Sequence, residues 1–268
     1  MANTIAQDTL APFIERCHSV LVNDAQDESK KAREYLSSRN ISAESITEHK
    51  IGYCPLKESL SEDIRSYGKS PYGNGGVKDY SYFIRGKIVV PVYTEFNQIT
   101  GFATRSPSHE PGNAWWNLPL PFKKSEHLFL LNKTRKNIFD KNKIYVVEGY
   151  MDAILLYQAG LKEVVSLMGI SLYPRKIGLM LRYCSHICFC MDTDENKSGQ
   201  IAQEKAIYTL KQFAMFDTIS IINGLPIGED PDVYVTKHGL PRFLSLEKQL
   251  TSPEIKEICK KVEVRAKK

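Results

Sequence analysis

The feature that most constrains the fold is a regular alternation of apolar runs and helical segments after residue 143. The predicted strands are residues 144–147, 163–167, 186–191 and 217–222. Apolar residues at helical spacing predict helices at 151–159, 173–183 and 198–214. Because strands separated by helices pair in parallel, this half of the chain predicts an α/β fold with a mostly parallel sheet flanked by helices.

Acidic side chains follow three of these predicted strands. Glu148 follows the first, Asp192 and Asp194 follow the third, and Asp230 and Asp232 lie beyond the fourth. The carboxyl ends of parallel strands meet at one edge of a sheet, so these groups should lie close together. Crowded carboxylates raise one another's pKa or bind a cation. Oxygen ligands without an accompanying histidine favour Mg²⁺ and disfavour zinc. For each acid alone, a helix cap or a solvated loop is the alternative.

Asp152 stands four residues after Glu148, at the start of a predicted helix. Its position supports two interpretations equally, an N-terminal helix cap and an outer metal ligand. Gly149, between them, would let the chain turn sharply and let a phosphate or metal approach the main chain.

The first 140 residues have a different organisation. Residues 9–37 show helical spacing, and Ser42 is placed to cap a short helix through Ser45. Residues 82–104 predict a hairpin around the turn residues 95–98. Residues 105–128, which hold four prolines and two tryptophans, predict an irregular connection in which at least one tryptophan lies in the core.

Charge and cysteine content narrow the class of protein. The formal net charge is +5, with basic clusters at 123–143 and 256–268 and carboxylates gathered between 148 and 232. Such a distribution could hold a polyanion while concentrating metal ions. None of the six cysteines has CxxC spacing, so we expect no disulfide framework and no zinc. No signal peptide and no apolar run of about 18 residues is present, so we expect a cytoplasmic protein without a membrane partner.

Three segments of the second half resemble one known family. "VVEGYMDAILLYQAGLKEVVSLMG" is similar to the first Toprim motif of bacterial DnaG-type primases. "CFCMDTD" resembles their Asp-x-Asp motif, and "LPIGEDPDVYVTKHG" resembles the segment that follows it. The upstream segments "AREYLSSRNISAESITEHKIGYCP", "YFIRGKIVVPVYTEFNQITGFATR" and "WWNLPLPFKKSEHLFLLNKT" are similar to the primase catalytic core. The resemblance runs from about residue 10 to about residue 245.

The resemblance implies three regions. Residues 1–140 would form a mixed α+β basic subdomain that holds template and nucleotide. Residues 141–225 would form the Toprim metal-binding domain. Residues 226–268 would hold the acidic "GEDPD" segment and a short helical tail.

The implied activity is synthesis of short RNA primers from ribonucleoside triphosphates on a single-stranded DNA template. The implied cofactor is Mg²⁺, with Mn²⁺ as a substitute. Asp192 and Asp194 would be the principal ligands, and Glu148 a ligand or proton acceptor. Asp152, Asp230 and Asp232 would complete the acidic surface.

Basic and aromatic residues of the first region complete the expected site. The residues expected to contact template or nucleotide are Arg85, Arg105, Lys123, Lys124, Trp115 and Asn117. For Arg85 and the two lysines, an ordinary solvated surface is the alternative.

The chain departs from the family pattern in several places. No Cys/His quartet of a zinc-binding domain precedes the core, and little follows residue 245. We therefore expect a phage or mobile-element version that depends on a helicase or a separate zinc-binding initiation protein. Thr193 and Ala114 replace a family glycine and lysine, and Gly199 lies five residues after Asp194 instead of three.

Two other functions use the same residues. A Toprim nuclease would place a water molecule with these acids. A non-catalytic replication accessory protein would keep the fold and bind DNA or a helicase.

Overall fold

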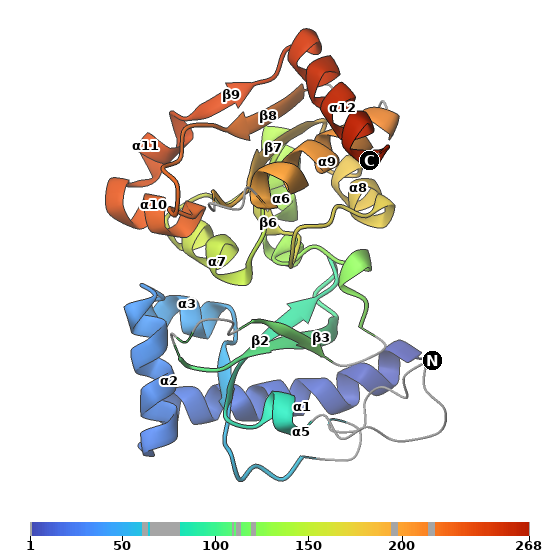
Figure 1. Ribbon diagram of the computed structural model, residues 1–268. Helices are drawn as coiled ribbons and strands as arrows, with labels where there is room; N and C mark the ends of the chain where they lie inside the picture. The colour runs from blue at the N-terminus through green and yellow to red at the C-terminus, as the bar shows by residue number, and fades with distance from the viewer. Residues whose placement is uncertain are drawn as a thin grey trace. The chain divides into compact units, whose positions relative to one another are not determined.

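The computed structural model describes residues 2–60, 64, 81–108, 110, 114–118, 122–193, 198–213 and 218–267 (Figure 1). The chain forms two compact units, residues 1–123 and 124–268. The boundaries expected at residues 140 and 225 stay predictions. Within the described residues, no helix combines the length and the apolar character needed to cross a bilayer.

The first unit packs long helices against an antiparallel sheet. Its elements are α1 (Ala2–Asn23), α2 (Asp27–Ser38), α3 (Ala43–Glu48), β1 (Gly52–Cys54), α5 (Ser81–Ile84), β2 (Lys87–Tyr93), β3 (Ile99–Arg105) and β4 (Trp116–Leu118). The strands lie in the order β1-β2-β3-β4. Phe13 of α1 stacks on Phe102 of β3 with ring centres 5.1 Å apart. Gly52 permits this packing, because a Cβ there would lie 2.6 Å from the main chain of Cys17.

Several expectations for this unit are confirmed and two are wrong. Residues 9–37 fall in the two helices α1 and α2 apart from a break at residues 24–26, and the Ser42 hydroxyl caps α3 by accepting a hydrogen bond from the Ser45 amide at 3.1 Å. The hairpin exists, but residues 82–84 belong to the helical turn α5 and not to its first strand. Neither tryptophan lies in the core. Trp116 on β4 is half exposed and packs on Phe83, whereas Trp115 is partly buried beside Arg105.

The second unit is the predicted α/β domain. Its elements are a 3₁₀ turn (Lys124–Glu126), α6 (Leu131–Lys141), β5 (Lys143–Val147), α7 (Tyr150–Gln158), β6 (Val164–Ser166), α8 (Pro174–Leu181), β7 (His186–Cys190), α9 (Ser198–Phe213), β8 (Thr218–Ile222), α10 (Pro231–His238), α11 (Leu240–Leu244), β9 (Glu247–Gln249) and α12 (Ser252–Ala266). The sheet order is β6-β5-β7-β8-β9. The first four strands are parallel, and β9 is antiparallel to β8. This confirms the predicted strand–helix alternation.

Side chains of the central strands point alternately to the two faces of this sheet, and both faces are buried. Ile144 and Val146 of β5 belong to one core cluster with apolar residues of α6, α8 and α9. Tyr145 and Val147 are also buried, but they lie outside that cluster. Helix α7 contributes nothing to the cluster and instead contacts α10. A sheet covered on both faces holds the carboxyl ends of its strands in fixed positions, where a site can form.

A cluster of polar side chains connects β9 to the parallel strands. The Glu247 carboxylate accepts hydrogen bonds from the Lys143 ammonium at 2.5 Å and from the Tyr145 hydroxyl at 2.8 Å. His186 lies 3.5 Å away and also contacts the Ser220 hydroxyl. Burial alone would raise the pKa of Glu247, but these partners lower it to about 2. The cluster therefore stabilises the sheet edge only while Glu247 is ionised.

Replacing Glu247 with glutamine is expected to lower the free energy of unfolding by about 2 kcal/mol near neutral pH, because charged hydrogen bonds are lost. The folded pKa lies below the usual 4.5, so the contribution is complete above that pH and disappears as the pH falls toward 2. Denaturant unfolding of both proteins at about pH 7 and about pH 3 measures this difference. Glu257→Gln, at an exposed ion pair of α12, is the control. Equal stability of wild type and Glu247→Gln near pH 7 would contradict this account.

Candidate functional site

Glu148 leaves β5 at its carboxyl end and is held there by the neighbouring chain. Its main-chain carbonyl accepts hydrogen bonds from the Ser166 hydroxyl at 2.7 Å and from the Gly169 amide at 2.9 Å. Its carboxylate Oε1 accepts the amide of Asp192 at 3.3 Å. The side chain is only 8% exposed. Glu148 therefore lies at the end of the central strands with its main chain fixed and its carboxylate next to Asp192.

Asp152 caps α7. Its carboxylate accepts a hydrogen bond from the Gly149 amide at 3.1 Å, which satisfies one of the free amides at the helix start. The cap interpretation is thus confirmed. The side chain is buried, and its charge still acts on Asp192. A buried cap at this position adds negative charge to the strand ends.

Asp192 is the centre of the acidic group. Burial is the main cause that raises the pKa of its carboxyl to about 9, and the charges of Asp152, Glu148, Asp230 and Asp232 add to it in that order. The structure thus brings Asp192 close to the described acids that were expected at the strand ends, Glu148, Asp230 and Asp232. Among the described residues, nothing hydrogen-bonds to the buried Oδ1 of Asp192. A buried oxygen with no partner and four negative neighbours is suited to bind a cation.

The acids beyond β8 lie at the start of α10. Asp230 occupies its N-cap position, and Asp232 is 2% exposed with its carboxylate accepting the Val233 amide at 2.7 Å. Thr193 connects this segment to Asp192. Its hydroxyl donates to the Pro226 carbonyl at 2.8 Å, and its own carbonyl accepts the Gly228 amide at 2.7 Å. The threonine that replaces a family glycine thus joins two acidic segments.

Gly199 is a site residue that sequence reasoning treated only as a change of spacing. It lies in the first turn of α9, where an added Cβ would overlap the main-chain carbonyl of Asp192 and lie 2.7 Å from Glu148 Oε1. The missing side chain therefore lets α9 approach both acids. A glycine one residue into a predicted helix was the signal that could have identified it.

The predicted ligand Asp194 lies outside the described residues. Within the described part of the chain, no three acidic, cysteine or histidine side chains converge closely enough to hold a metal ion by themselves. The donors that are described fit a hard cation, because they are carboxylate oxygens, one of which is buried without a partner.

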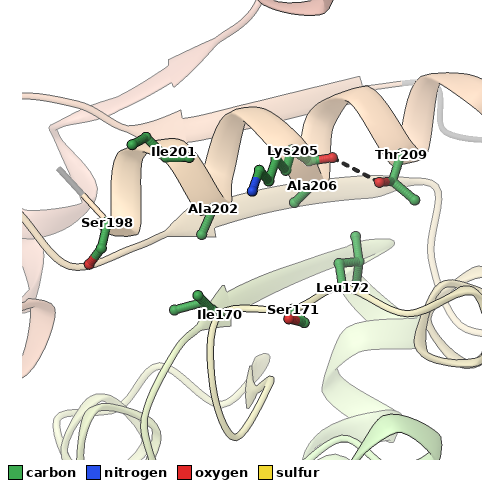
Figure 2. A pocket seen from close by; sticks show the side chains of 9 residues that line it. All are labelled: Ile170, Ser171, Leu172, Ser198, Ile201, Ala202, Lys205, Ala206 and Thr209. Atoms are coloured by element: carbon green, nitrogen blue, oxygen red, sulfur yellow. Dashed lines mark hydrogen bonds between the residues drawn. The ribbon is translucent and has the colours of Figure 1, made fainter. Parts of the chain in front are cut away.

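Two cavities adjoin α9. One, of about 390 Å³, has Asp192 and Thr193 at its wall and carboxamides from Gln200, Gln203 and Asn223. The other, of about 440 Å³, lies between α9 and the segment 170–172 and is lined by apolar side chains together with Lys205 and the hydroxyls of Ser171, Ser198 and Thr209 (Figure 2). None of the predicted site residues lines this second cavity. Only the first cavity is in contact with the acidic group.

The basic and aromatic residues that were predicted to contact template or nucleotide differ from one another in their surroundings. Arg105 ends β3 with its guanidinium 5.8 Å from the centre of the Trp115 ring, and its buried Nε has no hydrogen-bond partner among the described residues. Arg85 instead donates a hydrogen bond to the Glu58 carbonyl at 2.9 Å. Asn117 is half-buried on β4. Lys123 and Lys124 are exposed where the first unit ends and the second begins.

The parallel sheet with acids at the ends of β5 and β7 defines a Toprim-like domain. The family model described as Toprim-like matches residues 145–235. The model of the N-terminal domain of the DNA primase catalytic core matches residues 20–135. The chain therefore contains the DnaG-type primase catalytic core with its Toprim domain.

Individual relatives agree with this assignment. A DNA primase of Rickettsia typhi is 31% identical over 242 residues, which is 82% of this chain and 39% of the relative. A DNA primase of Enterococcus faecalis is 30% identical over 248 residues, 87% of this chain and 38% of the relative. The chain thus spans about two fifths of the curated relatives it matches. The crystal structure of the zinc-binding and RNA polymerase domains of Aquifex aeolicus primase superposes with a TM-score of 0.70 at 25% identity, covering 88% of this chain and 60% of that one.

Proposed function

We propose that this chain catalyses metal-dependent synthesis of short RNA primers from ribonucleoside triphosphates on single-stranded DNA. The observation that carries the proposal is the acidic centre, in which Asp192 has a buried oxygen without a partner among the described residues and a pKa raised by burial and by four neighbouring carboxylates. The curated relatives named DNA primase support the choice of reaction.

The proposed metal ligands are Asp192, Glu148 and Asp194. When bound, Mg²⁺ supplies charge neutralisation on the triphosphate and activates the attacking hydroxyl. Asp152, Asp230 and Asp232 raise the negative potential around Asp192, which favours cation binding over a protonated carboxyl. The cavity of about 390 Å³ beside Asp192 falls in the size range of small-molecule sites and leaves room for part of a nucleotide.

The proposed template contacts lie on the first unit, apart from Lys124, which begins the second. The Nε of Arg105 has no hydrogen-bond partner within the described part of the chain, and Trp115 lies beside it, so together they offer charge and a stacking surface. This combination is typical of proteins that bind single-stranded nucleic acid. Lys123, Lys124 and Asn117 complete the proposed contacts. Arg85 contributes less in this proposal, because it already donates a hydrogen bond to Glu58.

A metal-dependence assay tests the function. The full chain is mixed with single-stranded templates of varied sequence, labelled ribonucleotides and Mg²⁺ or Mn²⁺. We expect short RNA oligomers that disappear when a chelator is added and return with excess Mg²⁺, because the carboxylates alone do not neutralise the triphosphate.

Two other results would each contradict the proposal. Degradation of the template without RNA products would identify a Toprim nuclease. DNA binding with neither product, even with a zinc-binding initiation protein added, would identify a replication accessory protein.

A further inference from the structure

Lys176 is a buried lysine that the proposed reaction does not use. It is 1% exposed, in the third position of α8, which begins at Pro174. Its ammonium donates a hydrogen bond to the main-chain carbonyl of Leu167 and lies 5.8 Å from the centre of the Tyr173 ring. Among the described residues, no carboxylate lies within ion-pair distance of it. The carbonyl of Leu167 is thus its main polar contact.

A lysine at this place is unfavourable for stability. Burial and the charge of Lys124 lower the pKa of Lys176 to about 7. A cation in the first turn of a helix also opposes the helix dipole. An apolar side chain of similar length would avoid all of these penalties. A costly residue that contacts the segment following β6 points to a role in function.

The segment that Lys176 contacts also holds Glu148. Residues 166–169 leave β6 with two consecutive positive φ angles, 58° at Met168 and 139° at Gly169. The Ser166 hydroxyl and the Gly169 amide both donate to the Glu148 carbonyl. A non-glycine residue with positive φ is strained and persists only where its surroundings hold it. Lys176 supplies one of these contacts through Leu167.

The same segment also adjoins Lys124. The ammonium of Lys124 lies 3.5 Å from the position that a Cβ of Gly169 would take. Ser166 exchanges two main-chain hydrogen bonds with Phe129, at 3.0 and 3.1 Å, which fixes the chain that follows Lys124. One short segment therefore connects a proposed metal ligand, a proposed nucleotide contact and the buried ammonium.

We propose that Lys176 is a positioning residue that holds segment 166–169, and through it Glu148 and Lys124, in the arrangement that binds metal and nucleotide. Its relevance to catalysis rests on the proposed function, whereas its effect on the segment does not. Lys176 acts through main-chain contacts and touches no reacting atom.

The test compares Lys176→Met with Lys162→Met in the full chain. Lys162 is a matched control, because its ammonium also donates to a main-chain carbonyl, that of Tyr157, and lies over a tyrosine ring at the far end of α7. Three quantities are measured: the melting temperature, hydrogen exchange of the Leu167 and Gly169 amides, and Mn²⁺ affinity.

For Lys176→Met we expect an unchanged or raised melting temperature, because a buried charge is removed. We also expect about tenfold faster exchange of the two amides and about tenfold weaker Mn²⁺ binding, as for other residues that support metal ligands. Lys162→Met should leave amide exchange and Mn²⁺ affinity at wild-type values. Primer synthesis should follow Mn²⁺ affinity.

Unchanged amide exchange in Lys176→Met would overturn the proposal, as would a parallel fall of melting temperature and affinity in both variants. A wild-type chain that makes no RNA would overturn the proposed function alone, because the exchange measurement does not depend on activity.

Discussion

Asp192→Asn is expected to lower primer synthesis at least about 100-fold and, at the same time, to make the metal-free protein more stable. The loss of activity follows from removing the charge of Asp192, the proposed central metal ligand. The gain in stability follows from the electrostatics of the apoprotein, because near neutral pH the Asp192 carboxyl ionises freely in the unfolded chain, whereas burial and four neighbouring carboxylates disfavour its ionisation in the fold.

The direction in which the stability of the protein changes with pH follows from the raised pKa of the Asp192 carboxyl. The folded pKa of about 9 exceeds the ordinary 3.8, so ionisation favours the unfolded chain and subtracts stability as the pH rises between these values. Asparagine cannot ionise. We expect a gain of at least about 2 kcal/mol near pH 8, or roughly 5 °C or more in melting temperature, and almost none near pH 4.

Melting curves with a chelator across this pH range, paired with primer synthesis in Mg²⁺, measure both effects. Asp140→Asn is the control, because Asp140 is a half-exposed aspartate of α6 paired with Lys136. With saturating Mn²⁺ the wild type should become more stable than Asp192→Asn, because only the wild-type site gains binding energy. An Asp192→Asn variant that is less stable than the wild type and still synthesises primers would contradict this interpretation.

Gly199→Ala is expected to damage the site although alanine is the better helix former. A Cβ at residue 199 would overlap the Asp192 carbonyl and lie 2.7 Å from Glu148 Oε1. Main chain cannot move aside cheaply, so overpacking of about 1–3 kcal/mol should exceed the helix-propensity gain of about 1 kcal/mol. We expect a lower melting temperature and at least about tenfold weaker Mn²⁺ binding.

Gly178→Ala is a control substitution that is expected to raise the stability of the protein, whereas Gly199→Ala lowers it. Gly178 lies inside α8, and a Cβ there would meet nothing within 4 Å. This substitution should raise stability by up to about 1 kcal/mol and leave metal affinity unchanged. If Gly199→Ala also stabilised the protein and bound Mn²⁺ normally, the close approach of α9 to the two acids would be wrong.

The regular elements of the second unit could be predicted because their patterns are local and long. The runs at 144–147 and 186–191 correspond to β5 and β7, and residues 198–214 correspond to α9 within one residue. Elements defined by tertiary pairing were missed. Strands β1, β4 and β9 have three residues each, too few to show a period. The apolar residues 82–84 read as a strand because a single helical turn shows no period either.

The candidate site also has a part that could be predicted from the sequence and a part that could not. The acids could be located because they follow predicted strands, and parallel topology brings strand ends together. The residues that hold them act through main-chain contacts across long sequence separations. Ser166 supports Glu148 from 18 residues away, and Glu148 meets the Asp192 amide 44 residues away. Nothing in the sequence next to Lys176 indicates its contact, and for Gly199 the only local signal is a glycine at the start of a predicted helix.

The most direct test of the acidic centre is a crystal of the full chain grown with Mn²⁺ and analysed by anomalous scattering. The account predicts a manganese peak about 2 Å from Asp192 Oδ1, with a Glu148 oxygen in the same coordination shell. A structure in which these two carboxylates bind no common ion and point away from one another would contradict it.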